Sequence, residues 1–369
     1  MAKHFNVIPN GISRKLETPE PVQIGASTWW NAQNDPQLGV SRQWLIQAKE
    51  TWLNNFDWRR HERYINSFPN FKILVKDTEA GQIDIHFAAL FSRKKDAIPV
   101  VFLHGFPASF TEFLPMLELL TDKYTPETLP YHIVVPSLPG YGLSGSPSED
   151  VEMSVNQSAR LMNQFMMDLG FSDGYVVQGG DLGSMIARAM SVQYKECKAL
   201  HINIPSDPGT LGKWRQTGLA YALEHGTRPS TVGLAISASP LSLLAWIGEK
   251  LLEWTDPRNQ FSLETILNWV AFYWFTDTFP RSLYHATLVK SIMAREPLPI
   301  TKEKPLGYSK FAYDMVVLPK PWAEILYPNL TFFEEHSEGG HFASLEQPKA
   351  FLEDIEEFVH RVRGVFTFE

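Results

Sequence analysis

The chain has 369 residues, of which 44% are hydrophobic and 20% are charged. Its length suits two domains or one α/β domain with insertions, and its composition excludes an intrinsically disordered protein. Lysine and arginine number 33 against 41 acidic residues, which gives a formal net charge of −8. Since no basic cluster interrupts this negative balance, we expect neither nucleic acid nor an anionic membrane as a partner.

The cysteine content and the chain termini favour the cytoplasm. Cys197 is the single cysteine, so neither an intrachain disulfide nor a cysteine pair for structural zinc can form. The residues after Met1 lack the apolar core of a secretory signal peptide. The longest uncharged run, 229–248, is long enough for a bilayer, but serine, threonine and proline interrupt it. We therefore expect a soluble cytoplasmic protein.

Residues 1–95 are interpreted as an N-terminal extension. A tryptophan-rich stretch over 44–58 predicts helix, and the alternating run 83–87 predicts a strand. From residue 96 the pattern changes to short apolar runs that end at glycine-rich or proline-rich turns, at 99–103, 132–135 and 175–177. Such runs are typical of parallel strands that are covered on both faces.

The remaining segments complete an α/β pattern. A helical face over 159–169 separates the second and third apolar runs, as βαβ units require. Residues 206–300 hold five of the eleven tryptophans and are interpreted as a helical lid. The core then resumes over 301–369, with a strand at 329–333 and a final helix. The predicted class is α/β, with a mostly parallel sheet flanked by helices and two core parts, 96–205 and 301–369.

The sharpest motif is Gly179-Gly180-Asp181-Leu182-Gly183, between a predicted strand and a predicted helix. This is the strand, turn and helix context of a nucleophile elbow, G-x-S-x-G, with Asp181 in the place of serine. Leu182 N–H, at the start of the helix, is placed to stabilise an oxyanion. The alternative is an ordinary Gly-Asp turn in which Asp181 caps the helix.

A second motif, His104-Gly105-Phe106-Pro107, follows the first predicted core strand, 77 residues before Asp181. A loop at this position supplies the other oxyanion-hole amide in enzymes with a nucleophile elbow, so Phe106 N–H is the candidate. A strand-to-loop turn without any function is the alternative. The order and coincidence of the two motifs favour the catalytic interpretation.

A histidine and an acid complete the predicted site. His341 lies in the glycine-flanked loop between the last predicted strand and the C-terminal helix, and is the candidate general base. The acid that orients it should precede it in the chain. Asp314 fits, 27 residues upstream, while Asp277 and Glu303 compete for this role. Asp314 as a solvated loop carboxylate is the other alternative.

Further motifs accompany these over most of the chain: Pro-Ser-Leu-Pro-Gly-Tyr at 136–141, Thr-Arg-Pro-Ser at 227–230, Tyr-Trp at 273–274, Phe-Pro-Arg at 279–281, Glu-Gly-Gly-His-Phe at 338–342, and Phe-Asp-Trp-Arg at 56–59 with Phe-Pro-Asn-Phe at 68–71. Together they resemble the epoxide hydrolases of the α/β-hydrolase superfamily, in the microsomal-type branch as found in soluble fungal members. The resemblance implies that Asp181 is the nucleophile and that Asp314 and His341 complete the triad. It also implies that the N-terminal extension packs on the core and lid.

The aspartate itself favours an epoxide as substrate. A serine that opened an epoxide would leave an ether, whereas a carboxylate leaves an ester that water activated by histidine can hydrolyse. The amides of Phe106 and Leu182 would hold the resulting oxyanion. No metal or organic cofactor is implied, since side chains supply every reacting group. The expected partners are a small-molecule epoxide and water.

Ring opening also needs a neutral acid, and tyrosine remains protonated at pH 7. By resemblance, two lid tyrosines have this role, and Tyr221 matches the first. The position of the second holds Ala286 here. Tyr284 is the candidate substitute; otherwise His285 assists or Tyr221 acts alone.

Lid and loop aromatics, Phe272, Trp274 and Phe342, are candidates for an apolar substrate pocket, although such residues more often belong to the core. The resemblance also allows a homodimer formed through the lid, without an evident self-complementary surface in the sequence.

Two other functions stay open. A haloalkane dehalogenase uses the same aspartate, acid and histidine, but typically has a tryptophan after the nucleophile, where this chain has Leu182. An inactive hydrolase fold that binds a ligand would be expected to lack at least one of Asp181, Asp314 and His341.

Overall fold

The structure is a computed structural model that describes residues 6–7, 38–147, 151, 153–205, 218–283 and 298–367. Its strands are β1 (Asn6–Val7), β2 (Asn70–Asp77), β3 (Gly81–Leu90), β4 (Ile98–Leu103), β5 (Tyr131–Pro136), β6 (Tyr175–Gly179), β7 (Cys197–Ile202), β8 (Leu306–Phe311) and β9 (Leu330–His336). Its α-helices are α1 (Arg42–Asn54), α2 (Trp58–Asn66), α3 (Leu114–Lys123), α4 (Val155–Asp168), α5 (Asp181–Gln193), α7 (Ala220–Thr227), α8 (Pro229–Ser237), α9 (Pro240–Glu253), α10 (Leu263–Thr276), α11 (Phe279–Ser282), α13 (Lys320–Leu326), α14 (Ala343–Glu346) and α15 (Pro348–Arg361). Two 3₁₀ helices are η3 (Phe110–Phe113) and η5 (Arg363–Val365).

The strands form one sheet in the order β1-β2-β3-β5-β4-β6-β7-β8-β9. Strands β5, β4, β6, β7, β8 and β9 run parallel to one another, while the pairs β1–β2, β2–β3 and β3–β5 are antiparallel. The predicted α/β class with a mostly parallel sheet is confirmed. Every strand expected from an apolar or alternating run is present, whereas β1, β2, β7 and β8 were not predicted.

The expected boundary at residue 96 divides this sheet. Strands β2 and β3 precede it in the chain, yet β3 pairs with β5 over Phe87 to Leu90. Strand β2 lies near the sheet edge and keeps most of its side chains partly exposed. Its sequence therefore lacks the clean apolar alternation by which β3 was recognised. The two strands extend the core sheet by an antiparallel hairpin.

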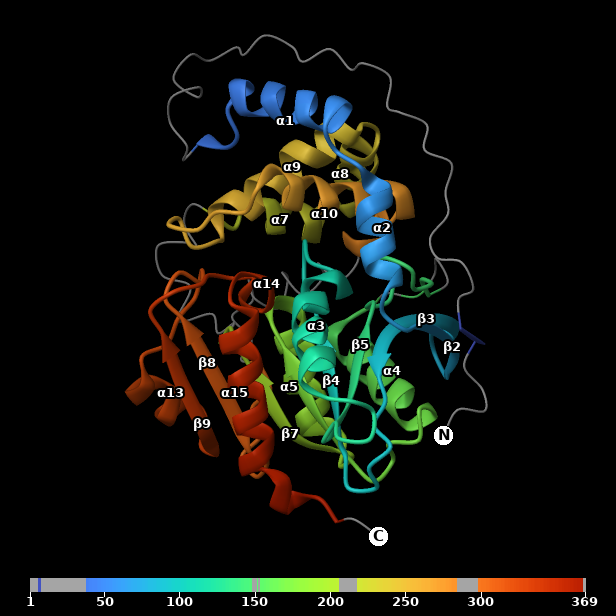
Figure 1. Cartoon of the computed structure of the whole chain (residues 1–369), viewed down its shortest axis with the longest axis vertical. Coiled ribbons are helices and arrows are strands. Elements are labelled where there is room, and N and C mark those ends of the chain that lie inside the picture. The colour runs from blue at the N-terminus through green and yellow to red at the C-terminus, as the bar shows by residue number, and fades with distance from the viewer. Residues whose placement is uncertain are drawn as a thin grey trace.

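Both faces of the sheet are buried, as the near-continuous apolar runs predicted. Along β4, Val101 and Leu103 face one core, and Val100 and Phe102 face the other. Helices α4 and α5 supply the first core, while α3 and α15 supply the second. Figure 1 shows α3 and α15 in front of the sheet. Alternate side chains of β4 therefore point to opposite faces of the sheet and contact different sets of helices.

The helices of the lid lie above the carboxyl ends of the parallel strands, and α1 lies across their outer side (Figure 1). The N-terminal helices contact the lid directly. Trp58 of α2 packs against Phe275, with ring centroids 5.1 Å apart, and Arg60 pairs with Glu264 at 3.1 Å. The buried hydrophobic residues of α9 and most of those of α10 belong to the same hydrophobic cluster as α4 and α5, while Ala271 and Phe272 of α10 belong to the cluster of α3 and α15. The lid is therefore continuous with the core.

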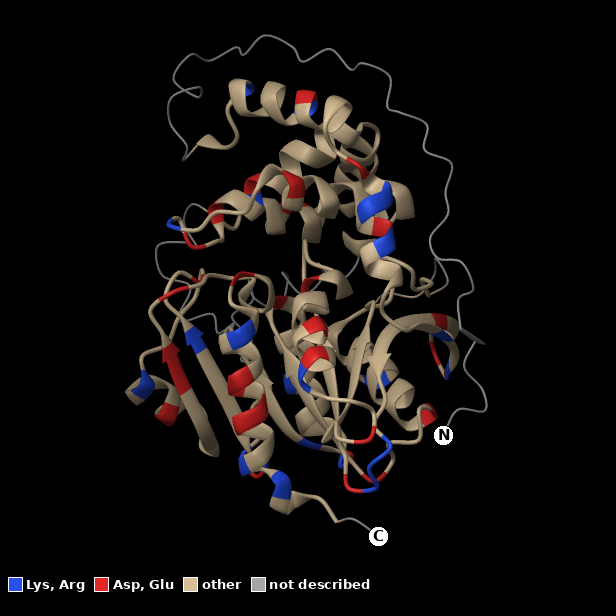
Figure 2. Ribbon diagram, viewed as in Figure 1, with Lys and Arg blue, Asp and Glu red and all other residues tan. Residues whose placement is uncertain are grey.

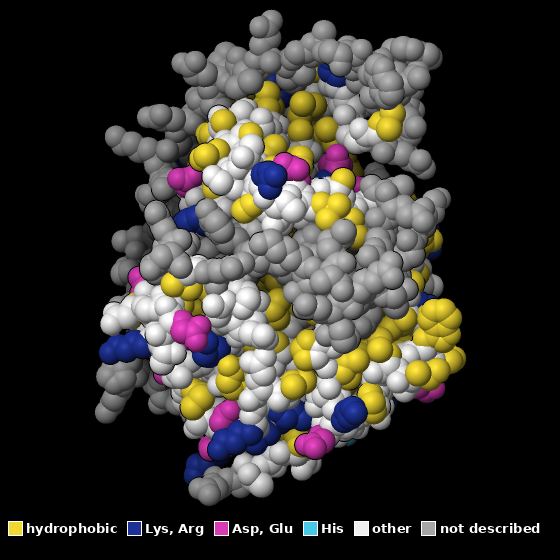
Figure 3. Space-filling view, turned by 180° about the vertical axis from the view of Figure 1, so that it is seen from behind, with side chains coloured by type: hydrophobic (Ala, Val, Ile, Leu, Met, Phe, Trp, Pro, Cys, Tyr) yellow, Lys and Arg dark blue, Asp and Glu magenta, His cyan; other side chains and the backbone are white. Residues whose placement is uncertain are grey.

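Charges of both signs are interspersed along the helices of the described chain (Figure 2). Hydrophobic side chains are mixed with polar ones over the back of the molecule (Figure 3). Two of the most exposed hydrophobic residues are Trp322 and Ile325 of α13, with 62% and 81% of their surface accessible. Within the described residues, no single helix is long and apolar enough to cross a membrane; α8 and α9 pass that test only as a pair bent by 115°.

Candidate active site

Asp181 stands at a sharp turn between β6 and α5, as the elbow motif predicted. Its φ of +46° lies in the left-handed region, which a residue with a side chain rarely occupies. Gly183 makes the turn feasible, because a Cβ there would lie 2.0 Å from the carbonyl oxygen of Leu103. The residue that caps α5 is Gly180, so the alternative in which Asp181 is the cap does not hold.

Two backbone amides donate hydrogen bonds to the Asp181 carboxylate. Phe106 N–H donates to Oδ1 at 2.8 Å, and the amide of Leu182 also donates to this carboxylate. Gly105 permits the approach, since a Cβ there would lie 2.3 Å from Oδ1. The two amides predicted for an oxyanion hole therefore meet at Asp181, one from the loop after β4 and one from the start of α5.

His341 lies between two carboxylates. Its Nδ1 is 2.9 Å from Asp314 Oδ1, and its Nε2 is 3.5 Å from Asp181 Oδ2. Both His341 and Asp314 are buried, with side chains 3% and 0% exposed, so Asp314 is no solvated loop carboxylate. Asp277, a competitor for the orienting role, ends helix α10 of the lid. The structure thus brings together the three residues that the sequence singled out.

The electrostatics of the three residues are coupled. Burial lowers the pKa of His341, but the charges and hydrogen bonds of Asp314 and Asp181 outweigh burial and raise it to about 10. Burial raises the pKa of Asp181, while the hydrogen bond and charge of His341 and the two backbone amides bring it below its ordinary value. At neutral pH the site holds an ionised aspartate beside a protonated histidine. An ionised carboxylate is the reactive form of a carboxylate nucleophile.

The loop that carries His341 is fastened by groups that the sequence analysis missed. Glu346 accepts hydrogen bonds from Gly340 N–H and Phe342 N–H, each at 3.0 Å, and from Asp256 N–H at 2.8 Å. His341 N–H donates to the carbonyl of Trp254 at 2.9 Å, and the two rings meet edge to face. Since Trp254 ends helix α9, the lid itself positions the histidine.

Tyr221 of α7 faces the site from the lid. Its ring stacks on Phe106 with centroids 6.1 Å apart, and Lys250 Nζ lies 4.9 Å from its ring centre. Burial, and next the charge of Asp181, raise its pKa well above the ordinary value. Tyr221 is therefore a neutral hydroxyl whose pKa responds to the charge of Asp181. Tyr284, His285 and Ala286 lie outside the described residues.

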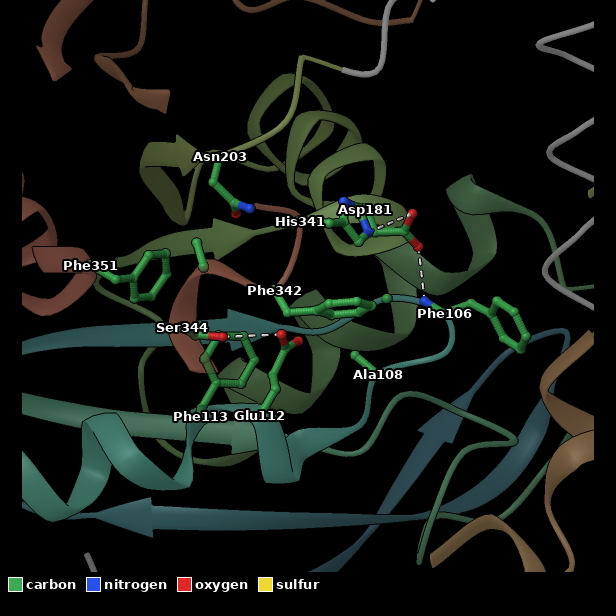
Figure 4. A pocket seen from close by; sticks show the side chains of 13 residues that line it. Phe106, Ala108, Glu112, Phe113, Asp181, Asn203, His341, Phe342, Ser344 and Phe351 are labelled. Carbon is green, nitrogen blue, oxygen red and sulfur yellow. Dashed lines mark hydrogen bonds and ion pairs between the residues drawn. The ribbon is translucent and has the colours of Figure 1, made fainter. Parts of the chain in front are cut away.

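The three aromatics expected to line a pocket are placed differently. Phe342 lines a small cavity beside Asp181 and His341 (Figure 4). Phe272 is only 2% exposed and packs against Phe110, so it is a core residue. Trp274 packs half-buried on the core and does not line this cavity. These two lid residues therefore pack against the core, which was the alternative to a role in the substrate pocket.

The same cavity has polar walls that the sequence analysis did not identify. Glu112 of η3, Asn203 after β7 and Ser344 of α14 line it together with Asp181 and His341. Burial raises the pKa of Glu112 to about 8. The sequence did contain a signal for a buried acid at this position. Glu112 lies within the largely apolar run Phe110-Thr111-Glu112-Phe113-Leu114, which is typical of a buried segment. In the described part of the chain, no three His, Cys, Asp or Glu residues are grouped as a metal site.

Comparisons with known proteins show the family of this chain. Residues 13–113 match the family described as "Epoxide hydrolase N terminus", and residues 98–228 match "alpha/beta hydrolase fold". The chain is 47% identical over 342 residues to a Dothistroma septosporum protein named "Putative epoxide hydrolase", covering 88% of this chain and 80% of the relative. The chain belongs to the epoxide hydrolase family.

Other epoxide hydrolases extend the similarity. "Epoxide hydrolase 1" of Sus scrofa is 30% identical over 372 residues, covering 87% of this chain and 80% of the relative. The solved structure of Aspergillus niger epoxide hydrolase matches with a TM-score of 0.84 and 42% identity, over 93% of this chain and 91% of the other. The resemblance inferred from the motifs is confirmed, and the α/β-hydrolase fold with it.

Proposed function

We propose that this epoxide hydrolase converts epoxides to vicinal diols through a covalent ester on Asp181. The single observation that supports this most is the position of His341, within 3.5 Å of Asp181 and 2.9 Å of Asp314, above a carboxylate held by Phe106 N–H. A nucleophilic carboxylate, a histidine and its orienting acid are the groups that a two-step ester mechanism needs.

In the first step, Asp181 attacks an epoxide carbon and the ring opens. Phe106 N–H occupies Oδ1, which leaves Oδ2 as the attacking oxygen and keeps Oδ1 as the future ester carbonyl. The C–O bond of the ring breaks, and the oxygen that leaves takes a proton from Tyr221. A tyrosine whose pKa is well above the ordinary value remains protonated and is available for this transfer.

In the second step, water hydrolyses the ester. Alkylation removes the negative charge of Asp181, which lowers the pKa of His341. The proton that His341 then releases restores the Tyr221 hydroxyl by way of solvent. Neutral His341 can now take a proton from water, while Phe106 N–H and Leu182 N–H stabilise the oxyanion on Oδ1. Each such donor is worth about 3 kcal/mol in comparable sites.

Trapping of the ester tests this proposal. A His341→Gln variant should form the ester without hydrolysing it, so intact mass after incubation with terminal aryl and alkyl epoxides should increase by one whole epoxide. Asp181→Asn is the matched control and should give no adduct. An adduct formed only with a chloroalkane, with loss of halide, would establish a dehalogenase instead, and no adduct with either reagent would point to an inactive ligand-binding protein.

A further inference from the structure

The cavity beside the nucleophile has the size of one water molecule. Its volume is about 10 Å³, and Asp181 and His341 form part of its wall. A buried water needs about this space and two to four polar partners. In Figure 4, Glu112 and Ser344 lie in this wall with the ring of Phe342, while Phe113 and Phe351 close it from the side of the core.

Glu112 is an unusual group to bury here. It is only 7% exposed, and its Oε2 accepts a hydrogen bond from Ser344 Oγ–H at 3.1 Å. A carboxyl group has two oxygens and about four acceptor positions, so this bond leaves capacity for a further partner. Burying such a group without adequate partners costs free energy, and a water in the cavity would supply one.

The charge state of Glu112 suits contact with water near Asp181. Burial raises the pKa of Glu112 to about 8, against smaller lowering effects of Ser344 and His341. At pH 7 it is therefore mostly neutral, and it brings no second negative charge beside the nucleophile. A protonated carboxyl can donate its O–H to a water oxygen or accept from a water hydrogen with its carbonyl.

We propose that Glu112, held by Ser344, is a positioning residue that orients the water which hydrolyses the Asp181 ester. This inference rests on the proposed function. The oxygen of that water bonds to Cγ of Asp181, and one of its protons moves to Nε2 of His341. The bond between Cγ and the alkyl-bearing oxygen then breaks. The departing alkoxide takes this proton and becomes the second hydroxyl of the diol, and the proton left on the carboxyl passes to His341.

The competing explanation is purely structural, since the bond between Glu112 and Ser344 also ties η3 to α14. The two roles differ in what they affect. If the bond between Glu112 and Ser344 only holds η3 against α14, its loss should affect ester formation and ester hydrolysis alike, or only the stability of the protein. Orientation of water acts only after the ester exists, so its loss slows hydrolysis and leaves ester formation unchanged.

The test is a single-turnover experiment on the whole protein with styrene oxide, in which rapid quenching and intact mass follow formation and decay of the ester. Glu112→Leu keeps the bulk and removes the polar group, while Glu112→Gln keeps a neutral group that can both donate and accept. Thr111→Val is the matched control: Thr111 is buried in the same η3 helix but does not line the cavity. Thermal unfolding checks that each variant is folded.

We expect Glu112→Leu to slow ester decay by about 10²-fold with ester formation unchanged, the cost of a misplaced reactant. Glu112→Gln should restore most of the decay rate, and Thr111→Val should behave like the unmodified enzyme. Should Glu112→Leu fail to fold, Ser344→Ala, which frees the Glu112 side chain, should still slow decay selectively.

Three outcomes would overturn the inference: equal slowing of formation and decay, unchanged decay in Glu112→Leu, or slowed decay in Thr111→Val. A Glu112→Gln variant as slow as Glu112→Leu would also contradict the role of a neutral hydrogen-bonding group. If the unmodified enzyme forms no ester on Asp181, the proposed function fails instead, and mass spectrometry separates that result from the others.

Discussion

The charge of Asp181 should control the pKa of His341, and Asp181→Asn isolates this effect. Asp181 Oδ2 and His341 Nε2 are 3.5 Å apart. Unit charges at that separation interact by about 5 kcal/mol at an effective dielectric constant of about 20. At about 1.4 kcal/mol for each pKa unit, this corresponds to a change of about 3 to 4. The pKa of His341, raised to about 10 in the native site, should fall to about 6 or 7 in the variant.

The variant imitates the ester, because both carry a neutral group in place of the carboxylate. A fall of this size would mean that formation of the ester itself converts His341 from a cation into a base that is neutral near pH 7. The direction of the change in the His341 pKa follows from the native arrangement. Two carboxylates favour the protonated ring, whereas burial favours the neutral ring. Removal of one carboxylate therefore lowers the pKa of His341.

Nuclear magnetic resonance titration of ¹⁵N-histidine-labelled protein measures the effect. The signal of His341 is assigned by its loss in a His341→Gln variant. Asp277→Asn serves as control, since Asp277 is a carboxylate at the end of α10 and asparagine also tolerates its left-handed φ of +53°. The reasoning is refuted if His341 still titrates near pH 10 in Asp181→Asn, or if the control lowers its pKa equally.

Three further predictions concern single side chains. Tyr221→Phe should slow ester formation by about 10²-fold by removing the proton donor, and unchanged formation in rapid-quench experiments would exclude Tyr221 as the acid. Asp314→Asn should slow ester decay by about 10⁴-fold, because an amide favours the wrong histidine tautomer, so the ester should accumulate in intact-mass spectra; prompt decay would contradict this. Arg160→Leu should lower the free energy of unfolding by about 1 kcal/mol at pH 7, because the hydrogen bonds of Arg160 are the largest of the effects, with the amides of Ala80 and Glu79, that lower the pKa of Asp77 to about 2, and denaturant unfolding measures this. Since the native pKa of Asp77 is depressed, this difference should shrink as pH falls from 4 towards 2, and a difference independent of pH would refute its origin.

The candidate nucleophile could be singled out from the sequence because the geometry of its turn is local. A strand, a glycine-bracketed residue and a helix follow one another in the chain, so the position of Asp181 needs no distant contact to be recognised. The surrounding apolar runs fixed the strands β4, β5 and β6 for the same reason. Strand β2 escaped because its partly exposed residues lack a clear period, and its place is set by pairing with β3.

The partners of the nucleophile depended on folding to different degrees. Motif order along the chain pointed to Phe106 and His341, but the choice of Asp314 over Asp277 was decided only when β8 and β9 placed it beside the histidine. Glu346 and Trp254, which fasten the His341 loop, carry no motif and act through contacts with backbone groups.

Sequence alone determined the α/β class and the elbow and singled out the candidate reacting groups, because periodicity and short motifs encode local backbone geometry. Tertiary structure decided the cavity, the burial of Phe272 and the place of Glu112. Glu112 and Ser344 are 232 residues apart and meet only when η3 packs against α14. The low-dielectric surroundings that raise the pKa of Glu112 and couple His341 to two carboxylates exist only once these distant segments have packed together.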